Sequence, residues 1–381
     1  MTKLFKEFFE SEKAGGMILI AATVLSLVLA NTGFGEDYQH IWHLKLGSHS
    51  LGHWINDGLM AIFFLLIGLE LEREIYKGEL SNIKDALLPI FAAIGGMIIP
   101  AGIYFLFNNG TPTQSGIGIP MATDIAFALG ALSLLGNRVP LSLKVFLTAL
   151  AVIDDLGAIL IIAFFYSKDL MLTNLFISLG IFAALLILNK LKVRYILVYL
   201  AGGVAMWYFM LHSGVHATIT GVLLAFAIPF GKSDADSPSY KLQHFLHKPV
   251  AFIILPLFAL ANTALTLDSD FSQLINEPSS LGIALGLVIG KPLGVFLMSY
   301  LAVATGISKL TEGLNWKNIF GSGILAGIGF TMSIFITLLA FEDETVINNA
   351  KLMILIASLV AGIIGYVFLN LVLGKGQPKK A

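Results

Sequence analysis

The chain alternates long apolar runs with short polar connections. A helix that crosses a hydrocarbon layer of about 30 Å needs about 20 mainly apolar residues. Because twelve runs approach or exceed that length, we predict an all-α polytopic membrane protein with twelve transmembrane helices, near residues 13–30, 57–72, 87–107, 112–135, 141–166, 172–189, 195–211, 214–230, 249–266, 281–304, 318–340 and 351–373. These spans use nearly the whole chain, so residues 1–381 are interpreted as one integral membrane domain.

The composition excludes the soluble classes of protein. Hydrophobic residues make up 57% of the chain and charged residues 12%, and the mean hydropathy is +0.86. Such values indicate that the lipid bilayer is the main partner of the surface. The absence of cysteine excludes a disulfide framework, a thiolate metal site and a cysteine nucleophile. Lys and Arg residues are dispersed along the chain, so no nucleic-acid partner is expected.

The first apolar run could instead be a cleaved signal peptide, because residues 17–30 are short for a span and end in small residues. Glu7, Glu10 and Glu12 precede this run, however, where a signal peptide carries basic residues. Residues 14–16 also lengthen the apolar stretch toward spanning length. We therefore predict a retained first helix.

The basic residues predict the orientation of the spans. With twelve spans, Lys45, Lys168 and Lys351 fall in connections on one side, and Lys291 lies in mid-membrane. All other Lys and Arg residues fall on the side of the two termini. Because basic connections stay in the cytoplasm, both termini are predicted to be cytoplasmic.

The polar connections are too short to hold a soluble catalytic domain, and one of them has a pattern of its own. Residues 43–51 alternate apolar and polar side chains around Gly47 and Ser48, which predicts a small β-hairpin on the outer side. An irregular loop is an equally supported alternative. Residues 374–381 are predicted to form a flexible C-terminal tail.

Four ionisable residues lie where the membrane tolerates charge least. Counted at 1.5 Å per residue from the nearest span end, Asp124, Asp154, Asp155 and Lys291 lie about 15 to 20 Å deep. A charge at the bilayer centre costs about 2.5 to 3.5 kcal/mol, so such residues are usually functional. A purely structural salt bridge is the alternative, but three acids and one base leave negative charge that a transported cation or protons could compensate.

The same depth contains signals for interrupted helices. Pro120 lies inside the fourth predicted span, four residues before Asp124, and Gly327 and Gly329 lie inside the eleventh. Proline and glycine free backbone carbonyls that can face a cavity. Interrupted spans in the two halves of a chain are typical of inverted-repeat transporters.

Asp124, Asp154, Asp155, Lys291 and the two glycines belong to longer motifs, and the chain has the motifs 55–61, 68–70, 122–130, 153–159, 213–218, 290–294 and 327–335. Through them the chain resembles the NhaA-type sodium/proton antiporters along almost its whole length. The resemblance implies a twelve-helix inverted-repeat fold with crossed, broken fourth and eleventh helices, and a homodimer held partly by the outer hairpin. It also implies a bacterial inner membrane protein, not an enzyme and without a cofactor, that exchanges intracellular Na⁺ or Li⁺ for external protons electrogenically.

The resemblance also assigns roles to individual residues. It makes Asp155 the main cation ligand and Asp154 both its neighbour and the partner of Lys291, while Thr123 and Asp124 line the helix crossing. Oxygen ligands of this kind suit Na⁺, a hard cation. Since a carboxylate binds either a proton or Na⁺, competition between the two would couple their transport.

Regulation is a separate expectation. The resemblance makes a cluster at the inner side a cytoplasmic pH sensor, formed by Glu70, Arg73, Glu74, His244 and His247. An ordinary interfacial charge cluster at the inner end of the second span is an equally supported alternative, formed by Glu70, Glu72, Arg73 and Glu74. The family pattern has an acidic residue before the first histidine, whereas this chain has Gln243, which puts the pH regulation in question but not the transport.

Other functions fit the sequence less well. An intramembrane aspartyl protease needs its two aspartates on different helices and a G-x-G-D motif, which the chain lacks. A passive cation channel would need a continuous polar pore. A proton-coupled transporter of another small cation or of an organic substrate stays open as the alternative, although no mid-membrane Arg is present to bind a carboxylate substrate.

Overall fold

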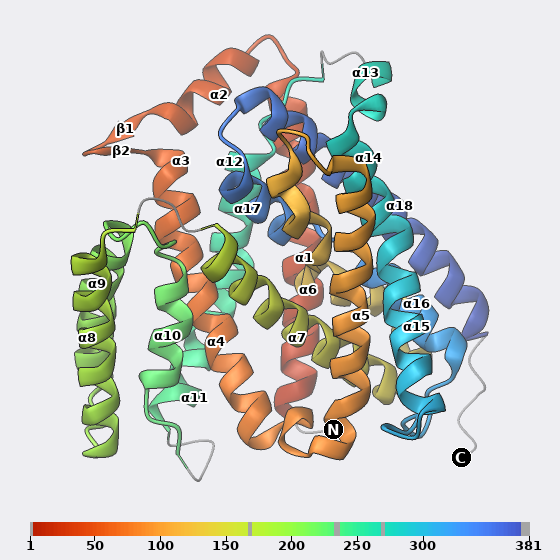
Figure 1. Ribbon diagram of the computed structural model, residues 1–381, viewed down its shortest axis with the longest axis horizontal. Coiled ribbons are helices and arrows are strands. Elements are labelled where there is room, and N and C mark those ends of the chain that lie inside the picture. Colours follow the sequence, from red (N-terminus) through yellow and green to blue (C-terminus); the bar gives the residue numbers. More distant parts are fainter. Residues whose placement is uncertain (1–2, 167–169, 232–236, 268–270, 375–381) are drawn as a thin grey trace.

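The computed structural model describes residues 3–166, 170–231, 237–267 and 271–374, and it is almost entirely helical (Figure 1). The predicted tail beyond residue 374 and Lys168 lie outside the described residues. The helices are α1 (Lys3–Ala30), α2 (Gly35–His43), α3 (Leu51–His53), α4 (Met60–Lys77), α5 (Ile83–Asn108), α6 (Ile125–Ser133), α7 (Leu141–Phe165), α8 (Leu172–Lys190), α9 (Ile196–Leu211), α10 (Ile219–Ala227), α11 (Pro238–Pro249), α12 (Leu255–Asn262), α13 (Phe271–Asn276), α14 (Pro278–Leu285), α15 (Lys291–Ala304), α16 (Trp316–Ala326), α17 (Phe330–Ala340) and α18 (Glu344–Val372).

Short π-helical segments at Trp54–Leu59, Val250–Ile254 and Gly286–Gly290 join some of these helices into longer ones. In the described part of the chain, 8 helices are long and apolar enough to cross a membrane, or up to 10 if each of two bent pairs counts as one span. The bent pairs are α1 with α2 and α16 with α17. The predicted spans at 195–211 and 214–230 correspond to the shorter helices α9 and α10. The polytopic helical class is therefore confirmed, while the twelve-span count stays a prediction.

The last helix begins earlier than the hydropathy indicates. The Asp343 carboxylate accepts hydrogen bonds from the backbone N–H groups of Thr345 and Val346, at 2.8 and 3.1 Å, and this cap starts α18 at Glu344. Lys351, expected at the start of the span in an outer connection, is instead enclosed in the helix bundle with 8% of its surface exposed.

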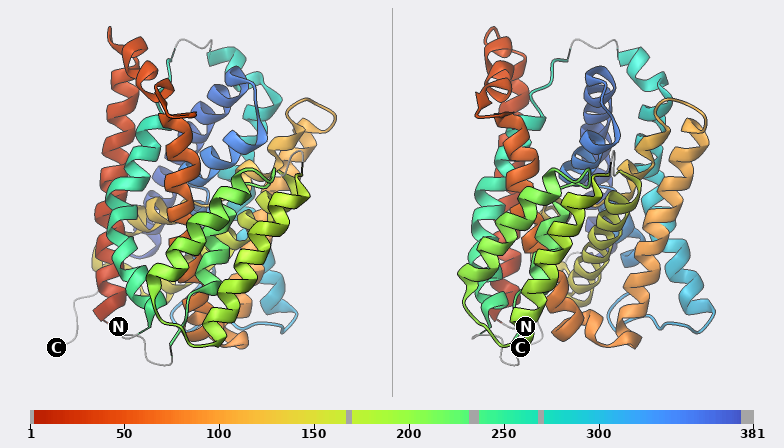
Figure 2. Two further views of the ribbon diagram at one scale, coloured as in Figure 1. Left: turned by 90° about the vertical axis from the view of Figure 1, so that its left-hand side faces the viewer. Right: turned by 60° about the vertical axis from the view of Figure 1, so that its left-hand side comes forward.

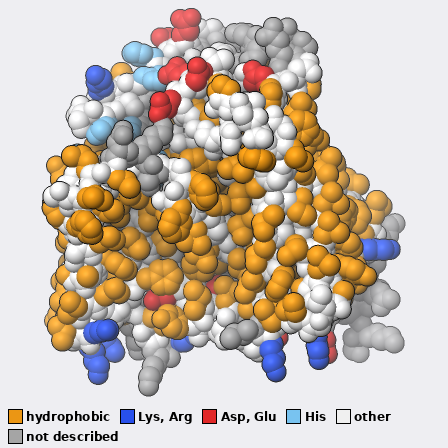
Figure 3. Space-filling model, in the orientation of Figure 1, with side chains coloured by type: hydrophobic (Ala, Val, Ile, Leu, Met, Phe, Trp, Pro, Cys, Tyr) orange, Lys and Arg blue, Asp and Glu red, His pale blue; other side chains and the backbone are white. Residues whose placement is uncertain are grey.

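The surface has a broad apolar belt between two polar ends (Figure 3). The end at which α1 begins is here called the terminal face, and the opposite end the hairpin face (Figure 1). In Figure 3 most visible Lys and Arg side chains lie at the terminal face, whereas acidic and histidine side chains gather at the hairpin face. Large apolar side chains such as Leu106 and Phe164 are about four-fifths exposed, at 80% and 78%, as expected for side chains that face lipid.

The hairpin face takes its name from two short antiparallel strands, β1 (Lys45–Leu46) and β2 (His49–Ser50). Lys45 pairs with Ser50 and Leu46 with His49. Gly47 has φ of +72° in the turn, a conformation that glycine adopts without steric cost. The Trp54 indole donates a hydrogen bond to the Leu46 carbonyl at 2.9 Å and fixes the hairpin to the helix that follows it.

The contacts between helices divide them into two groups, and Figure 2 shows the green helices α8, α9 and α10 of one group side by side at the front. The first group contains α1, α2, α4 and α8 to α12, and the second contains α5, α6, α7 and α14 to α18. The groups meet mainly where α1 packs on α6, α4 on α7 and α12 on α17. Gly16 and Gly130 allow α1 and α6 to approach closely, because a Cβ atom built on Gly16 would lie 3.1 Å from the Ala126 carbonyl oxygen.

Candidate ion site

Two adjacent carboxylates lie in the middle of α7. Asp154 and Asp155 are each 1% exposed, although the helix around them is almost wholly apolar. Burial of two carboxyl groups costs several kcal/mol each unless other groups compensate them. The groups that pack against α7 at this level therefore define the chemistry of the site.

The fourth predicted span is interrupted beside these carboxylates. A 3₁₀ segment, Gln114–Met121, contains Pro120 and is followed by extended backbone at Ala122 and Asp124 before α6 begins at Ile125. Proline removes a backbone donor and disfavours helical continuation, so the break follows from the local sequence.

The eleventh predicted span is interrupted at the same place. The helix α16 ends at Ala326, α17 begins at Phe330, and the two are bent by 47°. The Asp124 N–H donates to the Ile328 carbonyl at 2.7 Å, so the two breaks are joined directly through backbone groups. Two interrupted segments from distant parts of the chain therefore meet next to Asp154 and Asp155.

Asp124 caps both of the half-helices that start at the breaks. Its Oδ1 accepts from the Phe127 N–H at 3.0 Å in the first turn of α6, and its Oδ2 accepts from the Thr331 N–H at 3.1 Å and the Thr331 hydroxyl at 2.5 Å at the start of α17. A helix N-terminus carries about half a positive charge, so one carboxylate compensates two such ends. Asp124 is thus tied to the breaks rather than left open for a ligand.

Thr123 connects the breaks to the carboxylate pair. Its hydroxyl lies 2.6 Å from Asp154 Oδ2 and 2.9 Å from the Ala326 carbonyl oxygen. A hydroxyl has one proton and can donate to only one of these acceptors at a time. A change at the Asp154 carboxyl group can therefore alter how Thr123 holds the end of α16.

Lys291 is the cation that faces Asp154. It is fully buried at the start of α15, and its Nζ donates to Asp154 Oδ2 at 2.5 Å, a charge-assisted contact. Gly96 on α5 lies beside the ammonium group, and a Cβ atom there would be in van der Waals contact with Nζ at 3.7 Å. The structure thus places Lys291 and Asp154 together, as the sequence interpretation expected.

Asp155 has a different environment. Both of its carboxylate oxygens, and Oδ1 of Asp154, are buried and have no hydrogen-bond partner among the described residues. Oxygen atoms of this kind can bind a hard cation such as Na⁺ or accept a proton, and each would compensate their charge. The site therefore combines a satisfied ion pair with an adjacent unsatisfied carboxylate.

The residues expected to regulate transport lie between α4 and α11. Glu70 accepts a hydrogen bond from the Gln243 side chain, and Arg73 and Glu74 lie close enough to interact with its charge. The ring of His244 lies parallel to that of Tyr240, with centroids 6.3 Å apart, and His247 is on the next turn of α11. Glu70 lies on α4, which packs on the α7 helix that carries Asp155, so the cluster and the ion site lie on neighbouring helices.

Sequence reasoning missed several polar contacts in both places. Glu72 was treated as part of the surface charge cluster, but it is 3% exposed and accepts a hydrogen bond from Ser239 at 3.0 Å. Thr331, which binds Asp124, was not singled out either, although it lies in the first turn of the helix after the glycine-rich break. A hydroxyl next to a helix break was the available signal.

The family model and the curated relatives show the family to which this chain belongs. A family model described as Na+/H+ antiporter 1 matches residues 6–369. The Na(+)/H(+) antiporter NhaA of Flavobacterium psychrophilum is 71% identical over 373 residues, which cover 98% of this chain and 97% of that protein. The Na(+)/H(+) antiporter NhaA 1 of Flavobacterium johnsoniae is 61% identical, with 98% of each chain covered. A solved structure of the sodium proton antiporter MjNhaP1 from Methanocaldococcus jannaschii at pH 8 has 17% identity and a TM-score of 0.49, and covers 94% of this chain and 98% of that one.

Proposed function

Because the chain belongs to the Na+/H+ antiporter 1 family, whose members are transporters and not enzymes, we propose that it is an electrogenic antiporter that extrudes Na⁺ or Li⁺ from the bacterial cytoplasm in exchange for external protons. One observation supports this proposal most directly. Three buried carboxylate oxygens of Asp154 and Asp155 lie beside two helix breaks without a hydrogen-bond donor among the described residues.

Asp155 is the proposed exchange group. When Na⁺ binds its carboxylate, the proton must leave, and when a proton binds, the charge that holds Na⁺ is lost. The two ions therefore occupy the site in turn. Exposure of the site to one side of the membrane at a time then converts this competition into exchange.

Asp154 and Lys291 provide a second proton. Na⁺ at Asp155 also attracts the Asp154 carboxylate and competes with Lys291 for it. An ammonium group that loses its partner in this buried place is strongly disfavoured, so Lys291 would release a proton. Two protons would then leave for each Na⁺, and every cycle would move net charge that the membrane potential can drive.

The proposed architecture is a twelve-span inverted repeat in the inner membrane with both termini in the cytoplasm. The two interrupted segments that meet at Asp124 and Ile328 support the inverted repeat. The Lys and Arg side chains at the terminal face support its cytoplasmic position (Figure 3). The hairpin of β1 and β2 is the proposed contact between two copies in a homodimer.

We also propose that pH regulation acts through the cluster around Glu70. The packing of α4, which carries Glu70, on α7, which carries Asp155, supports this role, because protons gained or lost by the cluster would change the electric field at the ion site. Arg73, Glu74, His244 and His247 would adjust the charge of the cluster.

A proteoliposome assay tests the function. Purified protein is reconstituted with an internal pH dye, and Na⁺, Li⁺, K⁺ and Ca²⁺ are added in turn, with and without an imposed membrane potential. We expect proton flux with Na⁺ and Li⁺ that responds to the potential, and none from Asp155→Asn. Flux driven only by K⁺ or Ca²⁺, or no flux with any of the four ions, would instead favour the alternative, a proton-coupled transporter of another small cation or of an organic substrate.

A further inference from the structure

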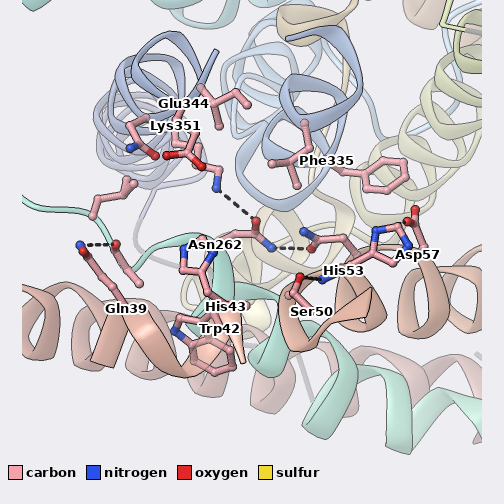
Figure 4. Close-up of a pocket in the computed structure, with 18 of the residues that line it drawn as sticks. Gln39, Trp42, His43, Ser50, His53, Asp57, Asn262, Phe335, Glu344 and Lys351 are labelled. Carbon is pink, nitrogen blue, oxygen red and sulfur yellow. Dashed lines mark hydrogen bonds and ion pairs between the residues drawn. The ribbon is translucent and has the colours of Figure 1, made fainter. Parts of the chain in front are cut away.

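A polar cavity of about 530 Å³ opens at the hairpin face, where the two groups of helices meet (Figure 4). Its wall comes from α2, α12, the start of the helix that contains α4, and the outer ends of α17 and α18. Among the described residues, neither Asp154 nor Asp155 lines it. Other residues therefore separate the cavity from the ion site.

A chain of hydrogen bonds crosses this cavity from one group to the other. Lys351 of α18, in the second group, donates from Nζ to the Asn262 Oδ1 of α12, in the first group, at 3.2 Å. Asn262 in turn donates to Asn56 Oδ1 at 2.8 Å and to the Phe258 carbonyl at 3.0 Å. Figure 4 shows the Lys351 ammonium pointing at the central Asn262.

A second contact of the same kind lies at the edge of the cavity. Nε2 of His216, a lining residue that belongs to the first group, is 3.0 Å from the carbonyl oxygen of Tyr166, at the end of α7 in the second group. A carbonyl oxygen can only accept, so this nitrogen carries the proton. Both contacts join the groups at the hairpin face.

The floor of the cavity lies close to the ion site. Phe335 lines the cavity from α17 and packs against Phe64 of α4, with ring centroids 5.2 Å apart and each residue 1% exposed. Thr331, which binds Asp124, is one helical turn away, or about 6 Å. If the two groups separated at this face, the contact between Phe335 and Phe64 would break and the cavity would extend to the ion site.

We propose that the hydrogen bond between Lys351 and Asn262 is a latch that holds the hairpin face closed, so that external protons reach the ion site only after it breaks. This inference rests on the proposed antiport, which requires each side to open in turn. The chemistry of the bond suits a latch. A buried ammonium paired with a neutral amide is held less tightly than one paired with a carboxylate, and it regains water when the cavity widens.

The absence of cysteine from the chain gives a direct test. Leu339 lines the cavity and is 9% exposed, so Leu339→Cys reports opening of the hairpin face through its labelling rate with a membrane-impermeant maleimide. On this background, Lys351→Met should raise the labelling rate about tenfold, the change expected when one hydrogen bond to a charged group is lost. Asn262→Asp should form an ion pair with Lys351 and lower the rate by a similar factor, together with the rate of exchange.

The matched control is Asn349→Ala. Asn349 lies two residues from Lys351 on the same helix and donates to Glu277 at 2.8 Å, but this bond stays within the second group. It should leave the labelling rate unchanged. The latch is overturned if Asn262→Asp labels at the unmodified rate, or if Asn349→Ala changes the rate as much as Lys351→Met does. Labelling needs no ion exchange, so this result is independent of whether Na⁺ is the substrate.

Discussion

Asp154→Asn should destabilise the protein, whereas Asp155→Asn should leave its stability unchanged or raise it, although both should abolish exchange. Asp154 carries the charge that pairs with the fully buried Lys291. Removal of one partner from a buried ion pair costs about 3 to 5 kcal/mol, because the other charge stays without compensation. Asp155 has no described hydrogen-bond donor to lose, so replacement of its carboxylate by an amide removes only a buried charge.

Thermal unfolding of the purified protein in detergent, monitored by tryptophan fluorescence, distinguishes the effects of the two substitutions on stability. Asp154→Asn should unfold at a clearly lower temperature than the unmodified protein, and Asp155→Asn should not. The control is the double variant Asp154→Asn with Lys291→Met, which removes both charges and should recover the lost stability. Equal unfolding temperatures for the two single variants, or no recovery in the double variant, would refute the assignment of the pair.

Three further predictions concern transport, regulation and assembly. Lys291→Arg keeps the pairing with Asp154 but cannot release a proton, so exchange by this variant should no longer respond to an imposed membrane potential. Lys291→Gln loses the pairing as well. Electrogenic exchange by the Arg variant would exclude lysine as a proton carrier. Gln243→Glu adds a negative charge beside Glu70 and should move the midpoint of the activity-versus-pH curve, and an unchanged curve would exclude this position from regulation. Deletion of residues 43–51 should weaken the dimer in cross-linking experiments while exchange continues, and loss of exchange in a folded monomer would contradict a purely assembling role.

The sequence predicted the centre of the site well because charge in a membrane is so costly. Asp154, Asp155 and Lys291 stand out from apolar surroundings, and their depths match when residues are counted along each span. Pro120 and the glycines at 327 and 329 indicated the breaks for a similar reason, since these residue types interrupt helical hydrogen bonding.

The sequence could not predict which oxygen atom each polar group contacts. The distinction between a paired Asp154 and an unpaired Asp155 depends on the rotation of α7 relative to α15, which residue spacing does not define. The burial of Lys351 was missed because a lysine at the edge of an apolar run usually indicates the end of a span. Only the cap by Asp343 and the packing of α18 show that the helix starts earlier, at Glu344, which is about two turns before Lys351 at about 3.6 residues per turn.

For Asp124, a role as a helix cap and a direct role in ion transfer predict opposite effects of substitution on the stability of the protein. Its two oxygens accept three hydrogen bonds from the starts of α6 and α17. In Asp124→Asn one acceptor oxygen becomes a donor, which must face either the Phe127 N–H or the two donors of Thr331. One half-helix then loses its cap and its compensating charge, so we expect a destabilisation of about 1 to 3 kcal/mol, with reduced exchange as a consequence.

Ser358→Ala is the reference variant with which the loss of stability in Asp124→Asn is compared. The Ser358 hydroxyl accepts from the Phe330 N–H at 3.2 Å, so it is a single neutral cap on α17, and its loss should cost about 1 kcal/mol. Asp124→Asn should therefore lower the unfolding temperature more than Ser358→Ala, and Thr331→Val should lie between them. If Asp124→Asn instead stops exchange while its unfolding temperature stays at that of the unmodified protein, the carboxylate takes part in ion transfer itself and the double cap is not its main role.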